Sequence, residues 1–391
     1  MEIRVHDSLE AIEPAAWDRL GGNSDPFLSH AFLVALERHG CLGEEYGWYP
    51  RHLAVYDGGK LIGATPLYAK TNSYGEFVFD WSWASAYERY GLHYYPKLVA
   101  AVPYTPITGR RLLVAPGIEP GPVQERLIDQ AIELARDLNC SGMHWLFTDA
   151  DDTARLRARG LPLRLGCQYH WHNNGYRDFE HFVDAFASRK RKKVLRERRR
   201  VAEQAVSLRT LHGHEVSAEL WGVVHRYYVD TFEKKAGLPT LTLDFFKEVG
   251  RTLGERVVVV LAEHGGEPVA AAINFRSDRA LYGRYWGCDQ DFHSLHFEAC
   301  YYQGLDYCIA HGLQTFEPGA QGEHKIGRGF LPTPTWSAHW IAEPAFARVI
   351  EDFCRREQRM MTEHCDQLFE LSPFCEDSMP PTQRRAPVLA P

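Results

Sequence analysis

The sequence lacks several features that would point directly to a class of protein. Its 9 cysteines are scattered and form no CxxC pair, which argues against a zinc cluster or a disulfide framework. No stretch approaches the roughly 18–20 uncharged apolar residues that cross a bilayer. The first residues also lack the basic region followed by an apolar one that marks a secretory signal. We therefore expect a cytoplasmic globular protein without a bound metal.

An excess of positive charge is absent as well. The formal net charge is -7, which argues against a general nucleic-acid binder, so we expect no DNA partner. What the chain does have is length and apolar content: it contains 391 residues, of which 45% are hydrophobic and 13% aromatic. This length is sufficient for two domains of ordinary size, and the apolar content is sufficient for a hydrophobic core.

The two halves of the chain show the same order of predicted elements. Each has a helix, two strands around a glycine turn, a third apolar run, a second helix and a further strand. The turns are Gly58-Gly59 in the first half and Gly265-Gly266 in the second. Duplication explains this order, and chance similarity between α+β domains is the alternative. We predict an α+β fold of two units, each a mixed sheet flanked by helices.

The composition also predicts where the units begin and end. The first unit covers 1–172, and a polar linker with a very basic helix covers 173–210. The second unit, 211–375, carries the main site. The tail 376–391 is rich in proline and polar residues and is predicted to be disordered.

The basic helix is the strongest local signal. From Arg189 to Arg200 it carries 9 basic residues and a single acid, Glu197. An apolar stripe of Val194, Leu195 and Val201 would let it dock while its other faces present cations. We predict capture of phosphates of a cofactor, RNA or a lipid surface. The alternative is a solvated helix neutralised by acids elsewhere. The predicted contacts are Lys190, Lys193 and Arg196.

The stretch from Phe316 to Trp340 collects ionisable side chains between glycines. Pro318 cannot donate to a ladder, so Glu317 lies at the end of a predicted strand. Lys325 is suited to neutralise a developing oxyanion, and His324 to move a proton near neutral pH. A solvated loop is the alternative. The further binding residues predicted here are Gln321, Gly322, Glu323, Arg328 and Gly329, with Arg328 holding a carboxylate or phosphate.

A predicted helix from His296 adds a carboxylate. Glu298 and Tyr302 are four residues apart and share one face. Burial beside an apolar stripe would raise the pKa of Glu298 toward that of a useful general base. The alternative is a glutamate paired with an arginine such as Arg284. The binding residues predicted around this helix are Tyr302, Gln303, Arg284 and Trp286.

Aromatic residues are concentrated in "DWSWASAYERYGLHYY" and "YGRYWG". A surplus of aromatic side chains on corresponding strands of the two units suits a channel for an amphipathic or acyl-bearing substrate. Packing in the core is the alternative.

The segment "FEACYYQGLDYCIAHGLQTFEPGAQGEHKIGRGFLPTPTWSAHW" resembles the signature of a bacterial family of predicted N-acyltransferases, the peptidoglycan-biosynthesis or FemAB-like proteins. The pieces "SRKRKKVLRERR", "GRYWG" and "YGLHYYPKL" extend the resemblance to nearly the whole chain. It implies two GNAT-like units in tandem and transfer of an acyl group to an amine. Related Fem-type transferases use aminoacyl-tRNA and a cell-wall precursor, whereas GNAT enzymes proper use acyl-CoA. Some bacterial ceramide synthases, which acylate a long-chain amine, are also similar.

One departure from the GNAT pattern concerns the donor. The pyrophosphate loop, Arg/Gln-x-x-Gly-x-Gly/Ala, is not found in Arg110–Gly117 or in Trp286–Ser294. The basic helix is the predicted substitute for its phosphate contacts.

Together these patterns predict an N-acyltransferase in which an amine attacks a thioester or ester carbonyl. Glu298 or Glu317 would remove the proton of the amine with His324 as a relay, and Lys325 with backbone N–H groups near Gly322 would stabilise the oxyanion. The predicted donor is acyl-CoA, and the acceptor is a small-molecule or lipid amine, reached in the cytoplasm or at the inner membrane surface. Aminoacyl transfer from tRNA to a cell-wall precursor is one alternative, and a non-catalytic acyl-ligand or lipid-binding protein is another.

Overall fold

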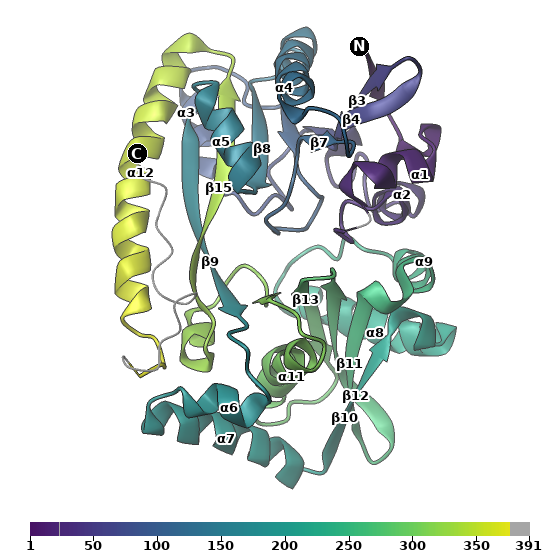
Figure 1. Ribbon diagram of the computed structural model, residues 1–391, viewed down its shortest axis with the longest axis vertical. Helices are drawn as coiled ribbons and strands as arrows, with labels where there is room; N and C mark the ends of the chain where they lie inside the picture. Colours follow the sequence, from purple (N-terminus) through teal and green to yellow (C-terminus); the bar gives the residue numbers. More distant parts are fainter. Residues whose placement is uncertain (23, 376–391) are drawn as a thin grey trace. The chain divides into compact units, whose positions relative to one another are not determined.

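The computed structural model of the chain describes residues 1–22 and 24–375 (Figure 1), so the predicted tail 376–391 lies outside the described residues. The chain forms two compact units. The first contains Met1–Gly166 and Thr335–Thr362, and the second contains Cys167–Pro334 and the segment from Glu363 onward. This division differs from the predicted one. The chain returns to the first unit at Thr335 because the strand that follows pairs there, and the basic helix is part of the second unit.

The strands of the first unit belong to two sheets. In one sheet, β1, β3, β4 and β7 pair antiparallel in that order. In the other, β2, β5 and β6 pair antiparallel, β6 and β8 are parallel, and β8 and β15 are antiparallel. β5 follows β4 directly after Pro66, and the chain passes there from the first sheet to the second. The strands are β1 (Glu2–His6), β2 (Trp48–Pro50), β3 (His52–Asp57), β4 (Lys60–Thr65), β5 (Leu67–Lys70), β6 (Lys97–Ala100), β7 (Leu113–Val114), β8 (Gly142–Thr148) and β15 (Leu331–Ile341).

The second unit repeats this succession. β10, β11, β12 and β13 pair antiparallel in order, β13 and β14 are parallel, and β14 and β9 are antiparallel. The same pattern of directions in both units confirms the predicted duplicated α+β fold. The strands are β9 (Leu163–His172), β10 (Val206–His212), β11 (Val257–His264), β12 (Glu267–Arg276), β13 (Ala280–Cys288) and β14 (Thr315–Glu317). β9 begins in the first unit, and β15 begins in the second.

Helices cover these sheets. Those of the first unit are α1 (Pro14–Trp17), α2 (His30–Arg38), α3 (Trp81–Arg89), α4 (Pro120–Asp137), α5 (Ala150–Ala158) and the start of α12 (Pro344–Phe369). Those of the second are α6 (Phe179–Asp184), α7 (Ser188–Glu203), α8 (Ala218–Lys234), α9 (Leu243–Leu253), α10 (Leu295–Phe297), α11 (Gln303–Ala310) and the short turns η5 (Glu298–Tyr302) and η6 (Glu323–Arg328). Further short turns are η1 (Leu9–Ala11), η2 (Asp18–Gly22), η3 (Gly213–Glu215) and η4 (Gly254–Arg256). Among the described residues, no helix has both the length and the apolar content that crossing a membrane requires.

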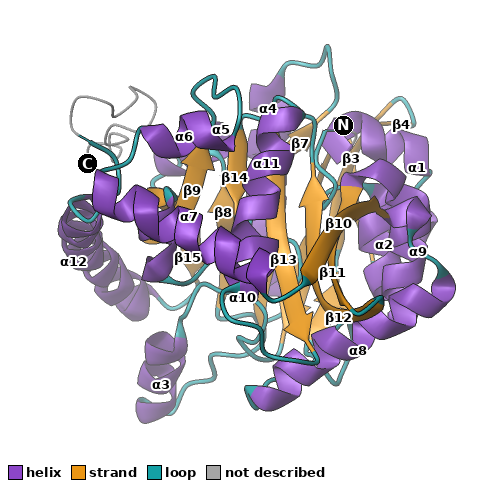
Figure 2. Ribbon diagram, turned by 90° about the horizontal axis from the view of Figure 1, so that it is seen from below, coloured by secondary structure: helices purple, strands orange, loops and turns teal. Residues whose placement is uncertain are grey.

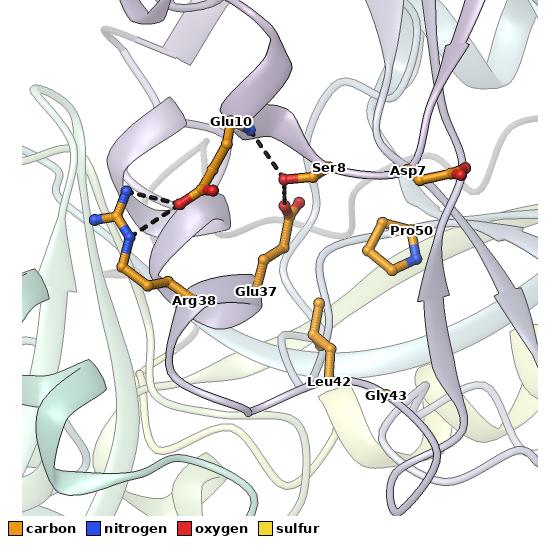
Figure 3. Close-up of a pocket in the computed structure, with 8 residues that line it drawn as sticks. All are labelled: Asp7, Ser8, Glu10, Glu37, Arg38, Leu42, Gly43 and Pro50. Atoms are coloured by element: carbon orange, nitrogen blue, oxygen red, sulfur yellow. Dashed lines mark hydrogen bonds and ion pairs between the residues drawn. The ribbon is translucent and has the colours of Figure 1, made fainter.

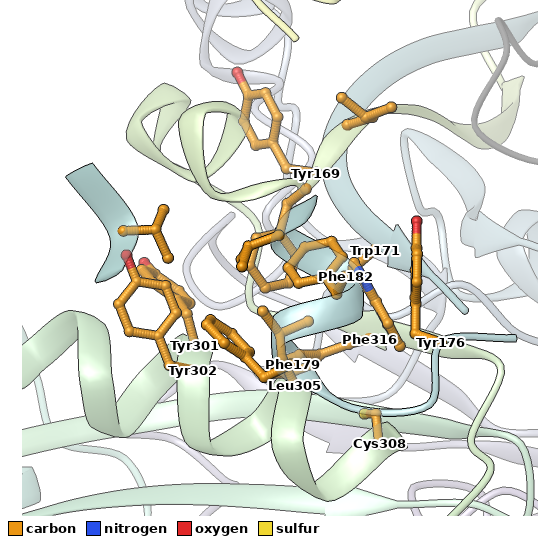
Figure 4. Close-up of a cluster of buried hydrophobic side chains, with 14 of the residues drawn as sticks. Tyr169, Trp171, Tyr176, Phe179, Phe182, Tyr301, Tyr302, Leu305, Cys308 and Phe316 are labelled. Atoms are coloured by element: carbon orange, nitrogen blue, oxygen red, sulfur yellow. The ribbon is translucent and has the colours of Figure 1, made fainter. Parts of the chain in front are cut away.

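Each unit has its own apolar core. In the first, Leu127 and Ile128 of α4 pack against the sheet residues Leu53 and Trp145. In the second, aromatic side chains of α6 and β9 meet the buried face of α11 (Figure 4). Figure 2 shows α11 beside β13 and β14. A side chain at Gly304 would meet the ring of Phe316 at 2.4 Å, so glycine permits this close packing.

Candidate active site

The parallel strands β13 and β14 separate after a short paired stretch. They pair from Ala280 to Tyr282, and β14 then ends because Pro318 cannot donate to the ladder. A cavity of about 300 Å³ lies where the two strands diverge. It is bordered by β13 from Gly283 onward and by the residues that follow β14, beginning with Pro318. A Cβ atom at Gly283 would lie 3.2 Å from Pro318 Cα, so the two segments approach closely only with glycine there. In the described structure, the edge of β13 beyond Tyr282 therefore faces the cavity without a strand beside it.

Lys325 places a buried cation in the wall of this cavity. Its side chain is 3% exposed, and Nζ donates to the carbonyl oxygen of Gly319 at 2.7 Å. Lys325 belongs to η6, which follows Gly322 with a φ of 112°, a value that favours glycine. Burial lowers the pKa of Lys325 to about 8. At pH 7 Lys325 is therefore mostly in its ammonium form, which is suited to stabilise negative charge in the cavity.

His324 lies in the same cavity and contacts a tyrosine. Its Nε2 is 2.9 Å from Oη of Tyr301, and both residues line the cavity. Partial burial and the nearby cations of Arg328, Lys325 and Lys193 lower the pKa of His324. The imidazole is therefore neutral at pH 7 and able to accept a proton. Of the other residues predicted in this turn, Gln321 lines the cavity and the exposed Glu323 does not.

Arg284 and Trp286, predicted as binding residues, both line the cavity from β13. The edge of Trp286 faces the ring of His296, with ring centroids 5.4 Å apart. Burial lowers the pKa of His296 to about 4, so this ring is also neutral at pH 7. The structure thus brings five of the predicted residues to one place, namely Arg284, Trp286, Gln321, His324 and Lys325.

Other cavity residues were missed by the sequence interpretation. Asn274, 2% exposed, donates from Nδ2 to the carbonyl oxygen of Val258. A polar residue inside the apolar run "VAAAINF" was a signal that could have identified it. Cys300 also lines the cavity, although it lies far from the glycine-rich stretch in sequence. Burial raises the pKa of its thiol, so the sulfur is not a thiolate near neutral pH and is a poor nucleophile.

Glu298 is not brought to the cavity. Its carboxylate accepts from Arg198 at 2.9 Å and from Nε2 of Gln303 at 2.8 Å. This is the arrangement of the alternative interpretation, a glutamate at the core boundary in an ion pair, with Arg198 in place of Arg284. We therefore assign neither Glu298 nor Gln303 a role in the reaction.

Arg328 and Tyr302 form a buried network rather than a ligand site. Arg328 is 4% exposed and donates to Glu197 at 2.8 Å, to Oη of Tyr302 at 3.1 Å and to the carbonyl oxygen of His324 at 2.7 Å. Its guanidinium also stacks over the ring of Phe297. These contacts occupy the guanidinium N–H groups that were predicted to hold a carboxylate or phosphate, so we correct that assignment. Gly329 likewise serves packing, since a Cβ atom there would meet the ring of Phe182 at 2.6 Å.

Glu317 lies at the end of β14, as predicted, but not in the cavity wall. It is 9% exposed, and its Oε2 is 3.8 Å from Nε2 of His170. Burial lowers the pKa of His170 to about 3, so that ring is neutral. The adjacent Pro318 and Gly319, by contrast, do line the cavity. Glu317 itself is not among the residues that line the cavity.

Helix α7 has two different flanks. On one flank, Arg191 pairs with Asp184 at 3.0 Å, and Arg198 pairs with Glu298 and with Asp306. On the other flank lie Lys193 and Arg196, which are exposed and have no acid partner among the described residues. The positive charge of Lys193 contributes to the lowered pKa of His324. Cations without acid partners thus lie near the cavity.

The buried stripe of α7 differs from the predicted one. Val194 and Val201 are buried as expected, but Leu195 is 38% exposed. Glu197, the single acid, is buried in its place because it pairs with Arg328.

The first unit has a hollow of about 480 Å³ beside η1 and α2 (Figure 3). Several of its polar groups bond to one another: Ser8 donates to Glu37 at 2.7 Å, and Arg38 pairs with Glu10. It offers no buried cation comparable to Lys325. In the described ranges of the chain, no cluster of three or more His, Cys, Asp or Glu side chains is placed to hold a metal ion.

Comparisons with known proteins agree with this architecture. The profile of the FemAB-like family, described as peptidoglycan biosynthesis/recognition, matches residues 8–376. The chain therefore belongs to the FemAB-like family. No curated protein sequence matches it.

Solved structures with a similar fold include FemX, with a TM-score of 0.53 and 13% identity over 90% of this chain and 100% of that one. L-PGS from Bacillus licheniformis has a TM-score of 0.53 and 11% identity over 90% of this chain and 98% of that one. The C-terminal domain of a putative lysylphosphatidylglycerol synthetase from Agrobacterium fabrum has a TM-score of 0.50 and 10% identity over 85% and 92%. At these identities the likeness concerns the fold alone, and it confirms the predicted tandem fold.

Proposed function

We propose that this protein is an N-acyltransferase that joins an activated acyl group to a primary amine in the cavity between β13 and β14. The observation that carries the proposal is the position of Lys325. A buried lysine is held by Gly319 in the wall of a cavity, next to a strand edge that has no neighbouring strand. A cation and backbone N–H groups directed at one space are what a developing oxyanion requires.

The reaction follows from these groups. The nitrogen of the amine attacks the acyl carbonyl carbon, and the carbonyl oxygen becomes an oxyanion that Lys325 and the open edge of β13 stabilise. His324, in contact with Tyr301, accepts the proton that the attacking nitrogen loses. The intermediate then collapses: the bond to the leaving sulfur or oxygen breaks, and that atom takes up a proton. Holding both substrates in one cavity supplies much of the acceleration.

The proposed donor is an acyl-CoA. Its phosphates would contact the unneutralised flank of α7 through Lys190, Lys193 and Arg196, because the usual pyrophosphate loop is missing from the sequence. The acceptor is a small-molecule or lipid amine, reached in the cytoplasm or at the inner membrane surface.

A second candidate is aminoacyl transfer from tRNA to a cell-wall precursor. Two observations favour it: the description of the family as peptidoglycan biosynthesis/recognition, and the length of the cationic flank of α7. Here the same flank would contact RNA phosphates, and binding would weaken steeply as salt is added.

The experiment that separates these functions is a donor screen. Release of free CoA from acyl-CoAs of several chain lengths is measured with and without primary amines, and charged tRNA is tested in parallel. Amine-dependent CoA release supports the proposal. Transfer from charged tRNA alone supports the second candidate. Binding of an acyl-CoA without turnover by any donor would identify a non-catalytic binding protein and contradict both.

A further inference from the structure

In the part of the chain that the structure describes, the large exposed aromatic side chains lie in one segment. Among the described residues, the large apolar side chains that are more than a third exposed include five aromatic ones, and all five lie between Tyr74 and Tyr90 in the first unit. They are Tyr74 (69%), Phe77 (38%), Phe79 (54%), Trp81 (42%) and Tyr90 (77%). We call residues 74–90 the aromatic segment. Exposed apolar surface concentrated in one segment in this way usually marks an interaction site.

The polarity of this segment is reversed. Ser73, Glu76 and Asp80 are buried, whereas the aromatic residues between them face outward. The buried Nζ of Lys97 holds the polar side chains inside: it donates to Glu76 at 2.8 Å, to Ser73 at 3.0 Å and to Asp80. Because both acids are fixed inward, the aromatic side chains cannot turn in to replace them. Their exposure is built into the fold.

The backbone of the segment is also fixed in an uncommon conformation. Phe77 has a φ of 60°, in the left-handed region that bulky residues rarely adopt. A second buried lysine, Lys70, donates to the carbonyl oxygen of Tyr74 and to the side chain of Asn72, each at 3.2 Å. Strain of this kind persists where surrounding contacts enforce it, and it is concentrated at functional positions. The segment is therefore a positioned surface rather than a loose loop.

Other aromatic residues of the same segment are buried in the core, in contrast to the five exposed ones. Trp83 and Tyr87 of α3 pack against Ile350 and Cys354 of α12. α3 therefore buries one set of rings and presents another. The ring of Trp81 meets that of Tyr74 edge-on, with centroids 5.2 Å apart, so exposed rings at the two ends of the reversed stretch contact each other.

The chemistry of the exposed surface indicates its partner. The exposed charged side chains of the aromatic segment are Glu88 and Arg89, both near its C-terminal end. From Tyr74 to Tyr87 no charged side chain is exposed, because the two acids of this stretch are turned inward. At roughly 200 Å² for a whole aromatic side chain, the exposed fractions of these five residues together offer about 560 Å². That is less than the roughly 800 Å² per partner of a stable protein–protein interface. It is sufficient for the boundary between lipid headgroups and acyl chains, where Trp, Tyr and Phe are preferred.

We propose that the aromatic segment docks this protein on the surface of a lipid bilayer, with Phe77, Phe79 and Trp81 entering the boundary between headgroups and acyl chains. Around these three residues lipid phosphates meet neither Glu76 nor Asp80, because Lys97 holds both acids inside. This docking depends on apolar contact, so it needs no anionic lipid and survives added salt. It differs in this respect from any contact made by the cations of α7, which salt weakens.

The test is partition into vesicles of phosphatidylcholine alone, at low salt and in 0.5 M NaCl (roughly a 4 Å screening length). The full chain is expected to bind at both salt concentrations. The variant Phe77→Asn, Phe79→Ser, Trp81→Ser is expected to lose at least about tenfold in partition coefficient. Asn is chosen at position 77 because it tolerates a positive φ. The matched control is Ile118→Ser, Leu138→Ser, which removes apolar side chains of the same unit that are 39% and 37% exposed. It should bind as wild type does.

Trp81 provides a second readout that does not depend on a triple substitution. Quenching of protein fluorescence by brominated lipid should be present in wild type and reduced in Trp81→Phe. Failure of the wild type to bind phosphatidylcholine overturns the proposal, and so does equal binding by the triple variant. Binding that requires anionic lipid and disappears in salt would assign the contact to α7. A change of oligomeric state in the triple variant would instead make the segment an interface between copies of this chain. The donor screen and this test can fail independently, because they concern different units.

Discussion

Glu197 and Arg328 form a buried ion pair, with a guanidinium nitrogen 2.8 Å from a carboxylate oxygen and side chains that are 8% and 4% exposed. Glu197 is the single acid in the basic run of α7, and Arg328 ends the turn that carries Lys325 and His324. Tyr302 donates to the same carboxylate. The pair therefore fixes the helix with the unneutralised cations against the turn that supplies the cavity with its reactive groups.

This relationship predicts a large effect on stability. Arg328→Met should lower the free energy of unfolding by about 3–5 kcal/mol, because it leaves the carboxylate of Glu197 buried without its cation. Denaturant unfolding measures the change. Arg199→Met, at an exposed position of α7, serves as the control and should change stability by less than about 0.5 kcal/mol. Equal effects of the two substitutions would show that the ion pair does not hold the turn.

The pKa of Lys325 predicts a pH profile. Because burial lowers this pKa to about 8, the ammonium form that stabilises the oxyanion is lost as pH rises through that value. The turnover rate kcat should fall on the alkaline side with a midpoint near pH 8. In Lys325→Arg the guanidinium stays charged, so the remaining kcat of this variant should not fall near pH 8. The same alkaline midpoint in that variant would mean that another group titrates there.

How much of this site the sequence could predict depends on how local each signal is. Lys325 and His324 follow a strand that a proline ends and a glycine that opens a turn, so their position could be predicted from neighbouring residues. The partner of Glu298 is Arg198, 100 positions away in the chain, and the partner of Arg328 is Glu197, 131 positions away. The packing of α7 decides which charges neutralise one another. This pairing cannot be read from any local sequence pattern.

The flank of α7 predicts how the donor binds. Lys193→Gln with Arg196→Gln should raise KM for a phosphate-bearing donor about tenfold, as expected when charge-assisted phosphate contacts are lost, with a smaller change in kcat. The salt dependence of KM should also become weaker. Arg251→Gln, at an exposed arginine of α9, is the control. If the double variant and this control have the same KM, phosphate contacts lie elsewhere.

Two buried histidines of the first unit predict sensitivity to acid. Nδ1 of His144 lies 2.9 Å from Nδ1 of His339, so one ring donates and the other accepts, and both are neutral. Burial lowers the pKa of His144 to about 3 and that of His339 well below its usual value. Below pH 6.5 the unfolded chain binds protons that the folded chain cannot. The free energy of unfolding should therefore fall with decreasing pH, by about 1.4 kcal/mol per pH unit for each ring.

Urea unfolding at pH 7 and pH 5 measures this loss of stability. His144→Gln should show a smaller difference between the two pH values than wild type does, because one buried imidazole is gone. His93→Gln changes an exposed ring and should leave the difference as it is in wild type. A wild-type stability that does not change between pH 7 and pH 5 would contradict the neutral buried pair.

The aromatic residues show a second limit of the sequence. Composition indicates an excess of aromatic side chains near residues 80–95, but not which of them form core. Trp81 is exposed and Trp83 is buried, because α3 turns only the latter toward α12. The reversed polarity around Glu76 depends on Lys97 of a different strand. The antiparallel pairs around the two glycine turns, by contrast, follow from local signals, whereas the pairing of β9 with β14 and of β15 with β8 does not.

The central claim is that Lys325 stabilises the oxyanion in the cavity between β13 and β14, and the most direct test is kcat for amine-dependent acyl transfer in Lys325→Met. We predict a loss of about 10²–10³-fold in kcat with little change in KM for the donor, as expected when an oxyanion contact is removed. Lys60→Met, at an exposed lysine of the first unit, should keep the wild-type rate. A Lys325→Met protein that folds and turns over at the wild-type rate would contradict the account.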